Sequence, residues 1–205
     1  MAALAADDTP RALSGGARPV ALFALRVLAW AVPLFAAWYL AAAPLSSAAG
    51  WVAARFVEAA APVDHVRVRY ADHRLAFAAE PDGDTMWRDR LPAGVVLDVD
   101  ANPMQYTCSI PFFLALVLAT TLRPAWRRAA AALGVLLLIA AAGLYVDVHL
   151  QLARLAGPAG GLLFATPPYA RELLALAFQV ATLLAPVLGP VALWMAAEGK
   201  ARISL

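Results

Sequence analysis

The chain has 205 residues, of which 63% are hydrophobic and 15% are charged, and its mean hydropathy is +0.71. Because soluble domains carry about 25% charged and 45–50% apolar residues, this composition indicates a membrane protein and excludes an ordinary soluble domain. The small, dispersed net charge of +2 argues against a nucleic-acid partner, and the single cysteine excludes an internal disulfide or a multi-cysteine metal site.

The first predicted transmembrane helix covers residues 19–45, which follow a polar and aperiodic tail over residues 1–18. This apolar run is longer than the roughly 20 residues that cross a hydrocarbon core of about 30 Å. A cleaved signal peptide is the alternative for such an N-terminal run, but a signal core has only about 7–15 apolar residues. We therefore interpret residues 19–45 as a retained anchor, which Pro33 is expected to kink.

Residues 46–105 are expected to form a small domain outside the membrane. The amphipathic stretch 46–61 is too short and too polar to span, which predicts a helix along the outer membrane face. In residues 66–80, apolar and polar side chains alternate on both sides of Ala71-Asp72-His73, the pattern of a β-hairpin. Residues 95–101 predict a third strand. So small a sheet needs a helix or a partner protein to cover its apolar face.

Three further apolar runs complete a predicted bundle of four transmembrane helices. The first of them begins at Tyr106, directly after an Asn102-Pro103 turn, and this turn marks the junction between the outer domain and the membrane. The predicted fold class is a membrane all-α helical bundle with a small periplasmic α+β insertion of about three strands between the first and second helices. The remaining segments are spans at 106–122, 129–150 and 173–197, loops at 123–128 and 151–172, and a tail at 198–205.

The distribution of basic residues predicts the orientation of the bundle. Arg123, Arg127 and Arg128 lie in the short connection between the second and third spans, and both tails are also basic. Because arginine and lysine in short flanks stay on the cytoplasmic side, both termini and this loop are expected in the cytoplasm. Residues 46–105 are then periplasmic, and the protein is expected in the inner membrane of a Gram-negative bacterium.

Cys108 and His149 are the candidate catalytic residues, because the predicted topology places both near the outer ends of neighbouring spans. A thiolate beside an imidazole is the minimum set for cysteine acyl transfer, with Arg154 available to stabilise an oxyanion. Membrane transpeptidases of the exosortase type use a Cys, Arg and His set, although they are longer and place a Gly closely after the Cys. The simpler interpretation makes Cys108 a small apolar filler and pairs His149 with Asp147 at the interface.

No metal or cofactor site is predicted. Asp98, Asp100 and Asn102 have the spacing that opens a calcium loop, but the positions where such a loop needs Gly and Glu hold Pro and Ser. Alternate residues of a strand that face water explain the same spacing. His65 and His73 flank the first strand with no further Cys or His nearby, which favours surface histidines over metal ligands.

Two polar residues lie inside or at the edge of predicted spans, Asp147 in the third and Gln179 in the fourth. Such groups usually face other helices rather than lipid. They are too few for a proton relay or a substrate path, so a transporter that works alone is not expected.

Several short motifs carry a resemblance to a known family. They are Asp100-Ala101-Asn102-Pro103-Met104-Gln105-Tyr106, Ile110-Pro111-Phe112-Phe113-Leu114-Ala115-Leu116, and the stretch from Ala170-Arg171-Glu172 through Pro186, Pro190 and Trp194. With the layout of one span, a small outer domain and three further spans, the chain resembles the exosortase H-associated membrane proteins. These are small inner-membrane proteins found with an exosortase in Gram-negative bacteria. Where that family tends to have Gly before a Leu-Pro, this chain has Cys108-Ser109.

The resemblance implies a non-enzymatic accessory role near the enzyme that cleaves and sorts C-terminal signals, and it transfers no catalytic residue. Asn102, Pro103, Tyr106 and Pro111 are then the residues of a structural junction. The expected partners are the lipid bilayer and an exosortase-like membrane enzyme, with no cofactor. Two alternatives stay open: a small membrane cysteine acyltransferase or protease that uses Cys108 and His149, and a structural subunit of another envelope assembly.

Overall fold

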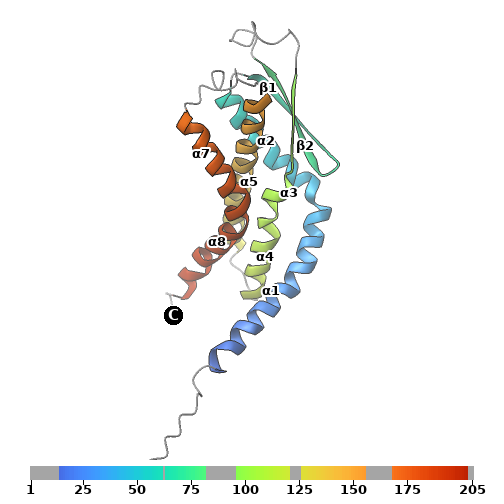
Figure 1. The fold of residues 1–205 in the computed structure, drawn as a ribbon. Helices are drawn as coiled ribbons and strands as arrows, with labels where there is room; N and C mark the ends of the chain where they lie inside the picture. The colour runs from blue at the N-terminus through green and yellow to red at the C-terminus, as the bar shows by residue number, and fades with distance from the viewer. Residues whose placement is uncertain (1–13, 62, 82–95, 121–125, 156–167, 203–205) are drawn as a thin grey trace, which may run out of the picture.

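The computed structural model describes residues 14–61, 63–81, 96–120, 126–155 and 168–202 (Figure 1). These residues form helices and one small sheet. In chain order the elements are α1 (Ser14–Leu40), α2 (Ala42–Ala60), β1 (Val63–Ala71), β2 (Arg74–Pro81), β3 (Leu97–Ala101), α3 (Met104–Thr107), α4 (Ser109–Thr120), α5 (Trp126–Leu155), α7 (Pro168–Gln179), the π-helix η1 (Val180–Leu184) and α8 (Ala185–Arg202).

The long helices run back and forth between the end of the molecule that carries the sheet and the opposite end (Figure 1). Helix α1 rises toward the sheet, α4 descends from it, α5 returns, and α7 with α8 descends again. The start of α1 and the end of α8 therefore lie at the same end of the bundle, away from the sheet. In chain order, the sheet follows the first of these helical passes, α1, and precedes the second, α4.

Three helical stretches are long and apolar enough to cross a membrane: Pro19–Leu40 with 22 residues, Trp126–Leu155 with 30 and Glu172–Ala197 with 26. These correspond to the first, third and fourth predicted spans. The second predicted span, 106–122, overlaps a described apolar stretch of 17 residues, Met104–Thr120, which α3, Cys108 and α4 form together. At 1.5 Å per residue it is about 25 Å long, less than the hydrocarbon core. Residues 121–125 lie outside the described part of the chain.

The first helix ends earlier than the hydropathy pattern predicts. Helix α1 stops at Leu40, Ala41 leaves helical geometry with φ −92° and ψ 11°, and α2 starts at Ala42. Pro44 falls in the first turn of α2, where an N–H would have no partner within that helix and a proline is tolerated. Helix α2 therefore includes four residues, 42–45, that the apolar pattern assigned to the span.

The fourth pass contains a π-helical turn that the sequence pattern does not indicate. Pro186 has no N–H to donate to the carbonyl of Thr182, and its ring would clash with that carbonyl in a regular helix. The turn widens over Val180–Leu184, and the Ala185 N–H bonds to the Val180 carbonyl instead. The Thr182 hydroxyl donates to the Phe178 carbonyl at 2.8 Å. The irregularity before Pro186 thus takes the form of a π-helix.

The three strands form one antiparallel sheet in the order β1-β2-β3, which confirms the predicted hairpin and third strand. The turn residues Asp72 and His73 have φ angles of 50° and 60°, as the two central residues of a type I′ turn do. Val68 lies opposite Phe77, which lies opposite Val99, so apolar side chains gather on one face.

Helix α2 and the sheet-facing part of α5 cover the apolar face of the sheet. The sequence left open whether a helix or a partner protein would do so, and the structure shows that helices of the same chain do. Gly50 of α2 lies so close to the sheet that a Cβ there would be 2.9 Å from Leu75 Cδ1. The shared core includes Val57, Leu75, Phe77, Val99, Tyr106, Leu144, Val148 and Leu152.

Candidate functional site

The junction between the sheet and the membrane helices is built around Asn102 and Pro103. The Asn102 side-chain oxygen accepts a hydrogen bond from the Met104 N–H at 3.1 Å, which fixes the direction of the chain as α3 begins. Pro103 is fully buried, and its carbonyl accepts from the N–H groups of Tyr106 and Thr107 at 3.1 and 3.0 Å. These bonds turn the end of β3 directly into a helix.

Tyr106 lies where this short helix meets α5. Its ring is 3% exposed, and a Cβ placed on Gly143 would be only 2.5 Å from Tyr106 Cδ1. Glycine at this point of α5 therefore lets the ring approach the helix backbone. The Tyr106 hydroxyl interacts with the Asp147 carboxylate one turn further along α5, in a geometry outside that of a regular hydrogen bond.

Gln151 extends this contact from α5 to the sheet. Its Nε2 donates to Asp147 Oδ1 and to the backbone carbonyl of Asp100, both at 3.0 Å. Asp147 and Gln151 are four residues apart and therefore neighbours on one face of α5. Tyr106, Asp147 and Gln151 together form a polar connection between α3, α5 and β3.

The end of the first helix is attached to the same region. Trp38 Nε1 donates to the Thr107 hydroxyl at 3.3 Å. The Tyr39 ring stacks on His73 at a centroid distance of 4.9 Å, with its hydroxyl 3.3 Å from His73 Nε2, and the Tyr70 hydroxyl lies 3.0 Å from His73 Nδ1. Helix α1 thus contacts both the junction and the tip of the hairpin.

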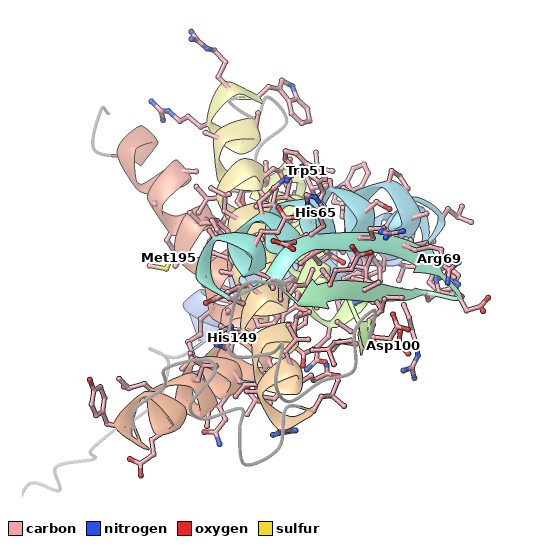
Figure 2. All side chains as sticks on the ribbon, turned by 90° about the horizontal axis from the view of Figure 1, so that it is seen from above. Trp51, His65, Arg69, Asp100, His149 and Met195 are labelled. Carbon is pink, nitrogen blue, oxygen red and sulfur yellow. The ribbon has the colours of Figure 1, made fainter. Side chains whose placement is uncertain are left out.

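The candidate catalytic residues lie on different elements. Cys108 is partly buried between α3 and α4, and its Sγ donates to the Gln105 carbonyl at 3.3 Å. His149 is 5% exposed on α5, with its ring 5.5 Å from that of Tyr145 (Figure 2). Arg154 is exposed in the last turn of α5 and, five residues on, lies about 140° around the helix from His149. This placement gives the acyl-transfer alternative no support from Arg154.

The remaining residues singled out from the sequence lie in a buried helix turn or on exposed strand positions. Pro111 is fully buried in the first turn of α4, where a proline is tolerated. Asp98 and Asp100 are exposed on alternate positions of β3, as their pattern predicts, and His65 is exposed on β1. Among the residues that the structure describes, no three His, Cys, Asp or Glu side chains are grouped so as to hold a metal ion.

Within the described part of the chain, each outer edge of the sheet forms a hydrogen bond with one helix side chain. On β1, the Val66 N–H donates to Glu58 Oε1 of α2 at 3.0 Å. On β3, the Asp100 carbonyl accepts from Gln151 of α5. The hydrogen bond from Val66 is the main cause that holds the pKa of Glu58 below its usual range, and the Arg55 guanidinium at 2.7 Å adds to the effect. A helix side chain thus occupies the edge of β1 at Val66 and the edge of β3 at Asp100.

The fourth pass presents a polar side chain outward from the bundle. Gln179 is exposed, as are the nearby Leu176 and Leu183. It lies seven residues into Glu172–Ala197, which places it about 10 Å along a helix long enough to span. An amide at this depth would lack hydrogen-bond partners in lipid.

A family model for exosortase H-associated membrane proteins matches residues 17–201, nearly the whole chain. The chain belongs to this family. The match covers nearly all of the first helix, the junction, the sheet and the later passes, so the family assignment applies to the molecule as a whole. A search of curated proteins and a search of solved structures each gave no significant match.

Three residues that organise this region were not singled out from the sequence. Glu58 and Gln151 each reach a strand edge that is distant in the chain, and Gly143 accommodates the Tyr106 ring. A glycine inside an apolar helix often marks a point where another group approaches the helix backbone closely. The contact at Gly143 could therefore have been predicted. For Glu58 and Gln151 the sequence offers no comparable local signal.

Proposed function

We propose that this protein is a non-enzymatic accessory subunit that binds an exosortase-type sorting enzyme in the bacterial inner membrane. Membership of a family named for its association with exosortase H supports such a partner. The hydrogen bonds of the junction support a structural role for Asn102, Pro103 and Tyr106, because their polar groups are used to connect elements of the same chain.

The observation that carries the proposal is the outward position of Gln179. The internal polar residues Asp147 and Gln151 bond to each other and to the sheet, whereas Gln179 faces away from the bundle. Polar side chains in spans usually hydrogen-bond across helix–helix contacts. The face of α7 and η1 around Gln179 is therefore the proposed contact with a transmembrane helix of the enzyme.

The proposed orientation places the sheet in the periplasm and both termini in the cytoplasm. Arg127 and Arg128 lie in the first turn of α5, at the end of the bundle opposite the sheet, which the positive-inside rule favours for the cytoplasm. A reporter enzyme that is active only in the periplasm should stay inactive when fused to the C-terminus. Activity of that fusion would contradict the orientation.

The test is affinity purification of the tagged protein from cells that also make exosortase H, in mild detergent, with mass spectrometry of the eluate. We expect the enzyme to co-purify with the wild-type chain. Gln179→Leu should lower its recovery roughly three- to tenfold, because one interhelical hydrogen bond is lost. Gln179→Asn, which keeps the amide, should retain part of the recovery.

A matched control separates this contact from lipid exposure alone. Leu188 is also exposed on the fourth pass, and Leu188→Ala removes apolar surface without removing a hydrogen bond. We expect Leu188→Ala to leave recovery of the enzyme unchanged. If the wild-type chain elutes without the enzyme, or if Gln179→Leu and Leu188→Ala behave alike, the proposed contact is wrong.

A further inference from the structure

The register of the hairpin determines which backbone groups of β1 are open. Antiparallel strands alternate between residues that exchange backbone hydrogen bonds and residues that do not. A two-residue type I′ hairpin closes on a bonded pair, which here is Ala71 and Arg74. Counting back from this pair, Arg67 and Arg69 bond to β2, whereas Val66, Val68 and Tyr70 turn their N–H and C=O groups outward.

The contact with α2 independently supports this count. The Val66 N–H donates to Glu58 and therefore points away from β2. Among the described residues, no hydrogen bond from another element reaches the backbone of Val68 or Tyr70 on this edge. The edge of β1 is thus occupied at Val66 and open over the next two outward positions.

A groove runs beside this open edge, between α2 and β1. Its volume is about 450 Å³, within the range of small ligand sites. Figure 2 shows Trp51 on the α2 side of the hairpin and Asp100 on the opposite side. The residues that line the groove and enter the argument are Trp51, Arg55 and Glu58 from α2 and Val66, Val68 and Tyr70 from β1.

The charge beside the edge is positive. Arg55 bonds to Glu58 and lies 5.4 Å from the Trp51 ring, and Arg67 forms an ion pair with Glu80. Arg69, near the hairpin tip in Figure 2, is exposed and has no carboxylate within 4.0 Å among the described residues. An added strand would therefore meet an arginine without an acidic partner on the outer face of β1.

We propose that this groove binds an extended segment of a partner polypeptide, which adds as a strand to the open edge of β1. Apolar side chains of the segment face the groove, and acidic side chains at alternate positions face Arg69. The inference deepens the proposed function by assigning a second contact of the accessory subunit, and it rests on that function for the source of the segment.

Two other occupants fit the same surface less well. A second copy of the chain would place its own Arg67 and Arg69 beside the same arginines, and like charges across strands are unfavourable. A lipid chain would fill the apolar part of the groove but would leave the N–H and C=O groups of Val68 and Tyr70 unpaired. An acidic extended peptide satisfies both the charge and the backbone groups.

The test uses the purified full-length protein in detergent micelles and a fluorescent peptide in which valine and aspartate alternate. We expect saturable binding that weakens as salt is added, and little binding of the peptide in which valine and lysine alternate. Val68→Pro removes the outward N–H without removing a bond to β2, because edge strands tolerate proline where the N–H faces outward. It should weaken binding about tenfold.

Matched variants keep the result interpretable. Val68→Ala retains the N–H and should therefore weaken binding much less than Val68→Pro does, whereas Arg69→Glu should weaken binding and Arg69→Lys should preserve it. The proposal is overturned if Val68→Pro binds the peptide as the wild type does. It is also overturned if the wild type forms dimers that Val68→Pro dissociates, or if it binds anionic vesicles and not the peptide. Co-purification of exosortase H is measured without the peptide, so that failure of either contact is seen separately.

Discussion

Two helical passes of this molecule are similar in composition but differ in how much of them the chain itself covers. The most apolar 18 residues of Trp126–Leu155 and of Glu172–Ala197 have mean hydropathies of 2.4 and 1.9. Of these residues, 39% are buried in the first helix and only 6% in the second. Helix α5 is the scaffold against which α2, α3 and the sheet pack. The fourth pass leaves most of its surface for lipid or a partner. Hydropathy identifies both as spans and does not distinguish these roles.

The largest expected effect comes from adding one methyl group to the scaffold helix. In Gly143→Ala the new Cβ would lie 2.5 Å from the Tyr106 ring, which is buried in the core. We expect the free energy of unfolding to fall by about 1–3 kcal/mol, the usual cost of overpacking. Denaturant titration of the protein in detergent, followed by tryptophan fluorescence, measures this change.

The same substitution on the fourth pass is the control. A Cβ on Gly189 would lie 3.6 Å from Leu136 Cδ2, an ordinary contact. Gly189→Ala should therefore leave stability within about 0.5 kcal/mol or raise it, because alanine favours a helix over glycine. Equal losses from Gly143→Ala and Gly189→Ala would contradict the division between a packed and an open pass.

A smaller effect is expected at the junction, where the packed unit begins. Asn102→Ala removes the acceptor for the Met104 N–H at the start of α3. The loss should be about 1 kcal/mol, the usual net contribution of one hydrogen bond. Amide hydrogens of the sheet should then exchange faster in Asn102→Ala, and this variant should recover less exosortase H in the pull-down. Asn102→Asp keeps an acceptor and should resemble the wild type. Unchanged exchange and recovery in Asn102→Ala would show that the side chain does not set the junction.

Much of the fold follows from local patterns in the sequence. Period-two alternation around Asp72-His73 and in residues 95–101 predicts the hairpin and the third strand, because each strand exposes one face. Long apolar runs predict three of the passes by length alone. The Asn102-Pro103 turn was also identified, since both residue types end regular structure in a recognisable way.

Other features depend on contacts between distant segments and were not predicted. The end of α1 at Leu40 falls inside a continuous apolar run, so hydropathy gives no signal there. Glu58 and Gln151 look like ordinary polar residues of a helix surface, and only the folded chain brings them to the two edges of the sheet. For the same reason the sequence alone does not locate the open edge of β1.

The smallest expected effect lies at the edge of β1, where α2 joins the packed unit. The native pKa of Glu58 is depressed, chiefly by the Val66 N–H, so this carboxylate contributes stability above its unfolded-state pKa, near 4.5. That contribution is lost as the pH falls through the native pKa, because protonation removes the charged acceptor. Hydrogen exchange at Val66, corrected for the intrinsic rate, should therefore lose protection below about pH 4.5 in the wild type. Glu58→Gln keeps a neutral acceptor and should remove this pH dependence; an identical acid response in both proteins would mean that another group controls the edge.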